Sequence, residues 1–275
     1  MVVLESNTFN LYENDVIIVQ QNIRSIRKNF DEFILKLQNL ITLPHVIILT
    51  EIWVKSHELS MYTIPKFSMY ANCNQNYRAG GVIIYVTDEL ENRVMVSPEM
   101  KTADKVHVQI SISESICLDV IGMYRLQAFH EECFVDELCN ILTVIKNKNL
   151  VLSGDINIDL LKKSSNVDNY LINMSNFGLE SLIHVPTRIN SSSNTLIDHL
   201  FVRCNGKLII CSSMVIDSQI TDHCMTALCI KCERNKNIKM SNENNGKLKL
   251  DLCKLKKLLK NTKWDAVYAA HTVTQ

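Results

Sequence analysis

The segment NLVLSGDINIDL begins as an apolar run and ends with Asp155, Asn157 and Asp159, three polar residues spaced two apart. Polar residues at the carboxyl end of a core strand are where α/β folds place their chemistry. The same residues could open an EF-hand calcium loop, but that loop needs Gly at position six and Glu at position twelve. Leu160 and Asn166 stand there, so a calcium loop is excluded. Taken alone, the segment could still be a solvated turn rich in Asp and Asn.

Five further apolar runs along the chain also end in polar or ionisable residues. These residues are Asn22, Glu51, Tyr124 with Arg125, Asp198 with His199, and Asp222 with His223. Strands that run together bring their ends together, so these side chains could share one cleft. His199 directly follows Asp198, and neighbouring residues on a strand face opposite ways. We therefore interpret His199 as a structural residue.

A cleft with this set of side chains suits phosphoester hydrolysis assisted by Mg²⁺. This ion prefers hard oxygen ligands and is usually held by one or two carboxylates together with substrate phosphate. Glu51 and Asp222 fit that role. A carboxylate such as Asp155 can orient or deprotonate the attacking water.

The charge that develops on the phosphoryl oxygens also needs hydrogen-bonding or cationic partners. His223, Asn157 and Tyr124 can supply them. Asp198 is the candidate carboxylate that fixes the tautomer of the histidine.

The runs that precede these residues predict an α/β fold. Short apolar runs typical of buried strands lie at 15–19, 46–49, 80–86, 106–112, 117–123, 151–152, 196–202, 208–210 and 227–230. Apolar residues at helical spacing predict amphipathic helices over 30–41, which Pro44 stops, and over 129–145. The polar residues named above would then stand where strands end.

The composition limits the classes of function that remain. With 275 residues and 47% hydrophobic content, the chain can form one large domain, with or without an appendage. Asp plus Glu balance Lys plus Arg at 29 each, so binding to phosphate must come from local clusters. The longest apolar runs are strand-sized, which predicts no membrane span. Ten cysteines without framework spacing, and no apolar signal peptide at the start, predict free thiols in a reducing compartment.

The composition changes after residue 231. Residues 231–249 are rich in Lys, Asn and Glu, which predicts a flexible, mildly basic linker. Leucines at 250, 252, 255, 258 and 259 with interleaved lysines then predict a short basic amphipathic helix. We expect one domain over residues 1–233 and an appendage over residues 234–275.

The polar residues in this order resemble the endonuclease/exonuclease/phosphatase superfamily, and more closely the endonuclease domain of non-LTR retrotransposons. Seven pieces carry the resemblance over most of the chain: QQNIRSIRKNFDEF, ILTEIWV, AGGVIIYV, IGMYR, LSGDINID, VPTRINSSSNTLIDHLFV and TDHC. Each piece is weak by itself, but seven pieces in the family's order are a strong pattern. The resemblance implies a four-layer α/β sandwich, in which two mixed β-sheets pack face to face with helices outside and the site at one rim.

The resemblance also implies a role for each matched residue. Asn22, Glu51 and Asp222 would lie on the metal side, and Tyr124 would contact the phosphate. Asp155 and Asn157 would handle the attacking water and the phosphate. His223 would be the catalytic histidine, with Asp198 as its carboxylate partner. Thr187 would lie beside the scissile phosphate. Arg125 and Arg188 adjoin matched residues and would touch the DNA backbone. Arg24, which stands where abasic-site enzymes usually carry an acid, could contact phosphate or belong to a solvated helix start.

The activity implied is a Mg²⁺-dependent DNA endonuclease, with Mn²⁺ as the alternative ion, that leaves 3′-hydroxyl and 5′-phosphate ends. A phosphatase or phospholipid-type hydrolase on the same fold is one alternative, and a non-catalytic nucleic-acid-binding remnant is another. The tail LDLCKLKKLLKNTKWDAVY looks like the start of a missing reverse-transcriptase region and could hold element RNA. We expect a monomer with DNA as its partner, no membrane, and a nuclear location.

Overall fold

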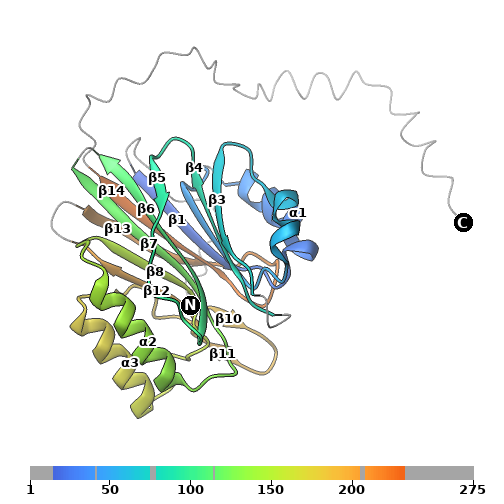
Figure 1. The fold of residues 1–275 in the computed structure, drawn as a ribbon. Helices are drawn as coiled ribbons and strands as arrows, with labels where there is room; N and C mark the ends of the chain where they lie inside the picture. The colour runs from blue at the N-terminus through green and yellow to red at the C-terminus, as the bar shows by residue number, and fades with distance from the viewer. Residues whose placement is uncertain (1–14, 41, 75–78, 114, 205–207, 233–275) are drawn as a thin grey trace, which may run out of the picture. The chain divides into compact units, whose positions relative to one another are not determined.

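Two mixed β-sheets form the centre of the structure, a computed structural model that describes residues 15–40, 42–74, 79–113, 115–204 and 208–232 (Figure 1). The first sheet has the strand order β13 (Leu208–Ile216), β14 (Met225–Cys232), β1 (Asp15–Asn22), β2 (Val46–Thr50), β4 (Val82–Thr87) and β3 (Phe67–Asn72). The second has the order β5 (Asn92–Val94), β6 (Ala103–Ser113), β7 (Ile116–Arg125), β8 (Leu150–Asp155), β12 (Asp198–Arg203) and β9 (Glu180–Ser181). In each sheet one central pair is parallel, β1 with β2 and β7 with β8, and the other pairs are antiparallel.

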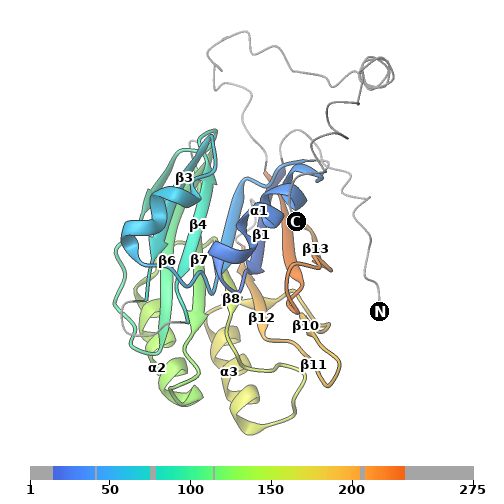
Figure 2. The ribbon, with the colours of Figure 1, turned by 90° about the vertical axis from the view of Figure 1, so that its right-hand side faces the viewer.

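Helices cover the outer face of each sheet (Figure 2). On the first sheet, α1 (Ile26–Gln38) buries Phe33 and Leu37 against residues of β1 and β2 such as Ile47. On the second sheet, α2 (Glu131–Val144) and α3 (Ser165–Asn176) pack their apolar residues against β7 and β8. The facing sides of the two sheets enclose a third core. This arrangement confirms the predicted four-layer α/β sandwich.

The period-two alternation of the strands decides which side chains reach the space between the sheets. On β1, Val16 and Ile18 belong to the core between the sheets, and Gln20 and Asn22 follow them on the same side. The same change occurs on β8. Val151 is in that core, and Asp155, four residues further along the strand, lies on the same side. The core between the sheets therefore becomes polar at one rim.

Some elements were not predicted from the sequence. Strand β3 is only partly buried along its length, and because it is an edge strand its hydrophobic pattern is weak. Helix α3 is rich in Ser and Asn, which favour turns, although its buried Val167, Tyr170 and Met174 have helical spacing. The 3₁₀ helix η1 (Ser56–Tyr62) and the hairpin of β10 (Arg188–Ile189) and β11 (Asn194–Thr195) were also not predicted.

The predicted basic linker and helix of residues 234–275 lie outside the described residues. Where the chain is described, none of its helices has the length and apolar character needed to cross a bilayer.

Candidate active site

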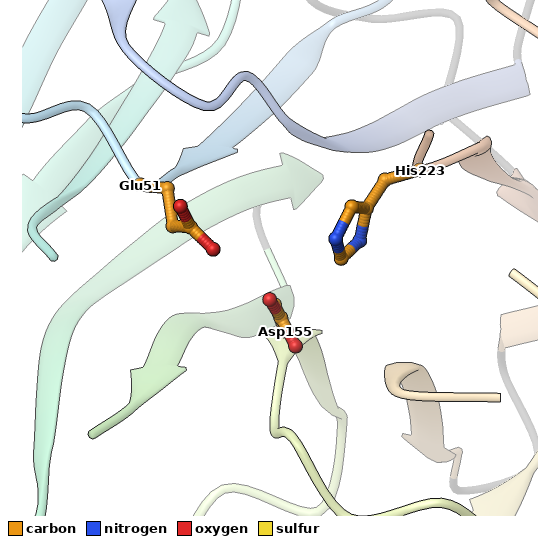
Figure 3. A group of neighbouring side chains, drawn as sticks. All are labelled: Glu51, Asp155 and His223. Carbon is orange, nitrogen blue, oxygen red and sulfur yellow. The ribbon is translucent and has the colours of Figure 1, made fainter. Parts of the chain in front are cut away.

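Three ionisable side chains from different parts of the chain meet at the polar rim (Figure 3). Glu51 follows β2, Asp155 ends β8, and His223 lies in the turn before β14. Each offers one ligand atom, and these atoms all lie within 4.8 Å of one another. All three residues are buried. The first sheet thus supplies Glu51 and His223, and the second supplies Asp155.

Asn22 links the two carboxylates of this group. Its Nδ2 donates hydrogen bonds to Oε1 of Glu51 and to Oδ2 of Asp155, both at 2.8 Å. Its Oδ1 accepts a hydrogen bond from the backbone N–H of Arg24 at 3.0 Å. Asn22, expected on the metal side, therefore lies beside the carboxylates as their shared hydrogen-bond donor.

A buried carboxylate orients His223. Oδ2 of Asp198 lies 2.8 Å from Nδ1 of His223, and the two side chains are 0% and 2% exposed. The backbone N–H of Asp198 donates to the hydroxyl oxygen of Thr187 at 2.9 Å. Thr187 is fully buried, so it supports Asp198 in this structure. Because Nδ1 is engaged, Nε2 is the ring nitrogen that remains for the reacting groups.

Burial and neighbouring charges shift the pKa values of this cluster. Burial raises the pKa of Asp155, and the nearby charges of Asp198 and Glu51 raise it further, to about 7. Burial lowers the pKa of His223, but the adjacent Asp198 outweighs burial and raises that pKa to about 9. At neutral pH His223 is therefore an imidazolium, and Asp155 has the pKa that suits a general base.

Tyr124 and Asn157 stand beside Asp155. Tyr124, one residue before the end of β7, pairs with Asp155 in the parallel register of β7 and β8. Burial raises the pKa of its phenol, and the charges of Glu51 and Asp155 add to this rise, so the hydroxyl keeps its proton. The backbone N–H of Asn157 donates to Oδ1 of Asp155 at 3.1 Å, and its side-chain oxygen accepts from Nε2 of Gln127 at 2.6 Å.

The backbone around the site adopts unusual conformations. Positive φ angles occur at Arg24 (41°), Ser25 (81°), Glu51 (55°), Trp53 (55°) and Asn157 (54°). Non-glycine residues rarely adopt this region, and such strain concentrates at functional sites. Here it turns the chain sharply just after β1 and β2 end and just beyond Asp155, which places Glu51 and Asn157.

Two arginines hold Asp222 at the edge of the site. Nη1 of Arg24 lies 2.7 Å from Oδ1 of Asp222, and Nε of Arg188 lies 2.8 Å from Oδ2. Asp222 was predicted to be a metal ligand, but in this structure it pairs with both guanidinium groups and lies outside the group of Glu51, Asp155 and His223. Both arginines are partly exposed, as a contact with phosphate requires.

Arg125 takes a different place from the one expected. It is only 5% exposed, and its guanidinium donates to the backbone carbonyls of Ile156, Phe129 and Asn157 at 2.7, 2.9 and 3.0 Å. These bonds use its donors to support the loop after β8. The structure thus gives Arg125 a supporting role in place of the predicted contact with the DNA backbone.

Asp159 and His199 have structural surroundings. Oδ1 of Asp159 accepts the backbone N–H groups of Leu161 and Leu196 at 3.2 and 3.0 Å, which fixes a turn. The ring of His199 lies fully buried between the hydroxyl of Tyr170 and the carbonyl of Ile158. Burial lowers the pKa of His199 to about 4, so the imidazole is neutral. This agrees with its predicted structural role.

Two glutamines near the end of β1, for which no role was predicted, also contact the site. Nε2 of Gln20 donates to Oδ1 of Asp198 at 3.1 Å. Nε2 of Gln21 donates to the backbone carbonyls of Asn22 and His223 at 2.8 and 3.0 Å. Their position after an apolar strand was visible in the sequence, but the partners Asp198 and His223 lie 178 and 202 positions away along the chain.

The donor set fits a hard divalent cation. Glu51 and Asp155 bring two carboxylates together in a buried place, and such oxygens are what Mg²⁺ and Mn²⁺ prefer. The raised pKa of Asp155 reflects burial first and then repulsion by neighbouring carboxylates. A bound cation would relieve both effects.

Comparison with known proteins extends this description. No known protein family and no curated protein matches the sequence. Among solved structures, the endonuclease domain of TRAS1, a telomere-specific non-LTR retrotransposon, matches with a TM-score of 0.64 and 15% identity, over 80% of this chain and 100% of that one. The AP endonuclease LMAP from Leishmania major matches with a TM-score of 0.62 and 10% identity, over 84% and 92%. D. rerio TDP2, complexed with single strand DNA product, matches with a TM-score of 0.57 and 11% identity, over 80% and 100%.

These solved structures share the fold of this chain. The chain has the α/β fold of the endonuclease/exonuclease/phosphatase superfamily. The neighbours include a retrotransposon endonuclease domain and an AP endonuclease. At these low identities, the likeness establishes the fold.

Proposed function

We propose that this protein is a divalent-metal-dependent phosphodiester hydrolase that nicks one strand of DNA. The observation that carries the proposal is the buried group of Glu51, Asp155 and His223 at the rim between the sheets. Asn22 links its two carboxylates, and Asp198 orients its imidazole. The names of the structural neighbours, an endonuclease domain and an AP endonuclease, support the same chemistry.

Glu51, with Asp155 beside it, would hold the cation, for which Mg²⁺ is our first choice and Mn²⁺ the alternative. Such an ion, when bound, neutralises charge on the phosphate. Asp155 orients the attacking water and takes up its proton. Burial and neighbouring carboxylates raise its pKa toward the range of a general base, while a bound cation would lower it. The amide of Asn22 donates to both carboxylates and so fixes their positions relative to each other.

His223 and Tyr124 stabilise the negative charge that develops on the phosphoryl oxygens. With a pKa of about 9, His223 enters the reaction as an imidazolium that can donate a charged hydrogen bond. Tyr124 keeps its hydroxyl proton because burial raises its pKa, so it serves as a second donor. In this proposal the carboxylates bind the metal, and His223 serves as a donor to the phosphate.

Arg24 and Arg188 form the cationic edge over which the DNA backbone would pass. Two guanidinium groups share the single carboxylate of Asp222, so this cluster has a net positive charge. Because the whole chain has equal numbers of acidic and basic residues, such a local cluster has to supply the attraction for phosphate.

The finer assignment is a target-site nickase of the retrotransposon type. It rests on the sequence motifs and on the fold shared with the TRAS1 endonuclease domain. In this proposal the products carry 3′-hydroxyl and 5′-phosphate ends, the protein acts in the nucleus as a monomer, and the tail of residues 234–275 holds element RNA.

The substrate class is tested with the full chain and two kinds of substrate. Supercoiled plasmid and inositol phosphates are incubated with the protein in Mg²⁺ and in chelator. We expect open-circle plasmid that forms only with Mg²⁺, and no phosphate release. Phosphate release without nicking would indicate a phosphatase instead, whereas DNA binding without any product would indicate a non-catalytic remnant.

A further inference from the structure

Gln20 is a buried amide at the polar rim that the mechanism above does not use. It is 1% exposed and lies on the same side of β1 as Ile18, which belongs to the core between the sheets. We propose that Gln20 is a positioning residue that holds Asp198, and through it His223, in the orientation needed for phosphodiester hydrolysis.

Four buried side chains form a continuous chain of hydrogen bonds. The hydroxyl of Thr226 donates to Oε1 of Gln20 at 3.2 Å, and Nε2 of Gln20 donates to Oδ1 of Asp198 at 3.1 Å. Oδ2 of the same carboxylate lies 2.8 Å from Nδ1 of His223. Gln20 and Thr226 are direct partners in the pairing of β1 with β14. The first sheet therefore fixes the position of this amide through its backbone.

The direction of these hydrogen bonds determines how the amide of Gln20 is oriented. An amide nitrogen only donates and a carboxylate oxygen only accepts, so Gln20 fits Asp198 in one orientation. The reversed amide would place Oε1 against Oδ1 of Asp198, which would leave two acceptors face to face. The hydroxyl of Thr226 stabilises the correct orientation because it donates to Oε1.

Both oxygens of Asp198 are thereby engaged, one by Gln20 and the other by His223. The plane of the carboxylate is fixed, so the imidazole has a stationary acceptor for Nδ1–H. Without Gln20, the carboxylate could rotate about its Cβ–Cγ bond, and His223 would lose its single orientation. Small misplacements of a reacting group cost large factors in rate.

The first experiment measures the orientation of His223 without any reaction. A hydrogen-bonded imidazole Nδ1–H gives a proton resonance well downfield of the backbone amides, and its loss in His223→Ala assigns it. In the metal-free full chain, we expect this resonance to move or broaden in Gln20→Met. The matched control is Gln109→Met, which removes an amide donating to Oδ1 of Asp119 at 2.8 Å, and it should leave the resonance unchanged.

The second experiment separates chemistry from binding, and it rests on the proposed function. We expect the single-turnover nicking rate of Gln20→Met to fall about 10- to 100-fold, as for other residues that orient a reacting group. The affinity for DNA, measured with Ca²⁺ in place of Mg²⁺, should stay within about twofold, since no DNA-contacting group is removed. Gln109→Met should retain the wild-type rate.

Thr226→Val provides a test that preserves the shape of the side chain if Gln20→Met does not fold. It removes the hydroxyl that orients Gln20, and we expect a smaller change of the same resonance. An unchanged resonance in folded Gln20→Met, or in Thr226→Val where the first variant does not fold, overturns the proposal. A wild type that nicks no DNA would refute the proposed function and leave the resonance test intact.

Discussion

The close approach of Glu51 and Asp155 lowers the stability of the fold. The two carboxylates are buried close together, and the amide of Asn22 donates a hydrogen bond to each of them. Burial raises the pKa of Asp155, and the charges of Asp198 and Glu51 raise it further. Functional residues of this kind commonly reduce the stability of a fold.

Replacing Glu51 with Gln should therefore stabilise the metal-free protein. The amide oxygen still accepts from Asn22, and the like charge beside Asp155 is gone. We expect the melting temperature in chelator to rise by about 2–4 °C, equivalent to about 1 kcal/mol. The shift that Mg²⁺ causes in the wild type should disappear. Glu180→Gln, at an exposed position, is the control, and a Glu51→Gln protein that still responds to Mg²⁺ would contradict the assignment.

The affinity for Mg²⁺ should depend on pH through Asp155. The pKa of this carboxyl, raised to about 7, means that at pH 6 most molecules carry a proton the cation must displace. Above pH 7 the carboxylate is already ionised, so binding strengthens as the pH rises through 7. Calorimetry at pH 6 and pH 8 should show about tenfold weaker binding at pH 6, one pH unit below the pKa. Equal affinities at the two values would show that Asp155 does not hold the cation.

At the scale of elements, the close approach of β7 and β8 positions Asp155. A Cβ atom on Gly154 would lie 1.8 Å from the carbonyl oxygen of Met123, so no other residue fits without a shift of the backbone. Gly178 offers a contrast: its φ is +70°, but a Cβ there would meet only the side chain of Arg203 at 3.5 Å.

Gly154→Ala should consequently destabilise the protein by at least about 2 kcal/mol and displace Asp155. We expect nicking to fall by more than tenfold in the molecules that remain folded, because small displacements of a catalytic group are costly. Gly178→Ala should cost about 1 kcal/mol for its backbone strain and leave nicking unchanged. Denaturant unfolding and plasmid nicking measure both effects, and wild-type nicking by Gly154→Ala would refute the positioning argument.

Most central elements could be predicted from the sequence because buried strands leave a clear pattern. The runs at 15–19 and 46–49 lie within β1 and β2, and the run at 117–123 lies within β7. Edge strand β3 and the Asn-rich α3 could not be found in this way, because β3 is only partly buried and the Ser and Asn residues of α3 favour turns. Buried strands can thus be predicted from the local sequence pattern, whereas edge strands and polar helices are stabilised mainly by tertiary packing.

The candidate site was predictable in its residue types and less so in its contacts. Asn22, Glu51, Asp155 and His223 do come together. The pairing of Asp222 with two arginines, and the burial of Arg125 against backbone carbonyls, depend on loop conformations that no periodic pattern encodes. Positive φ angles at Arg24 and Asn157 are part of these conformations.

At the scale of the whole molecule, charge balance predicts a shallow salt dependence for DNA binding. Acidic and basic residues are equal in number, and among the described residues the proposed mechanism places Arg24, Arg188 and His223 against phosphate. Three such contacts give a slope of log K against log salt of about −3. Arg188→Ala should make this slope less steep by about 1, while the exposed Arg93→Ala should not change it. A far steeper slope would indicate an additional DNA-binding surface.

Plasmid nicking by site variants of the full chain tests the central claim most directly. Wild type, Asp155→Ala and His223→Ala are compared at equal concentration with Mg²⁺, after circular dichroism has shown that all three are folded. The proposed mechanism predicts open-circle product from the wild type alone, with 3′-hydroxyl and 5′-phosphate ends. Nicking that persists in folded Asp155→Ala or His223→Ala would contradict it, because the reaction would then proceed without the group at the rim of the two sheets.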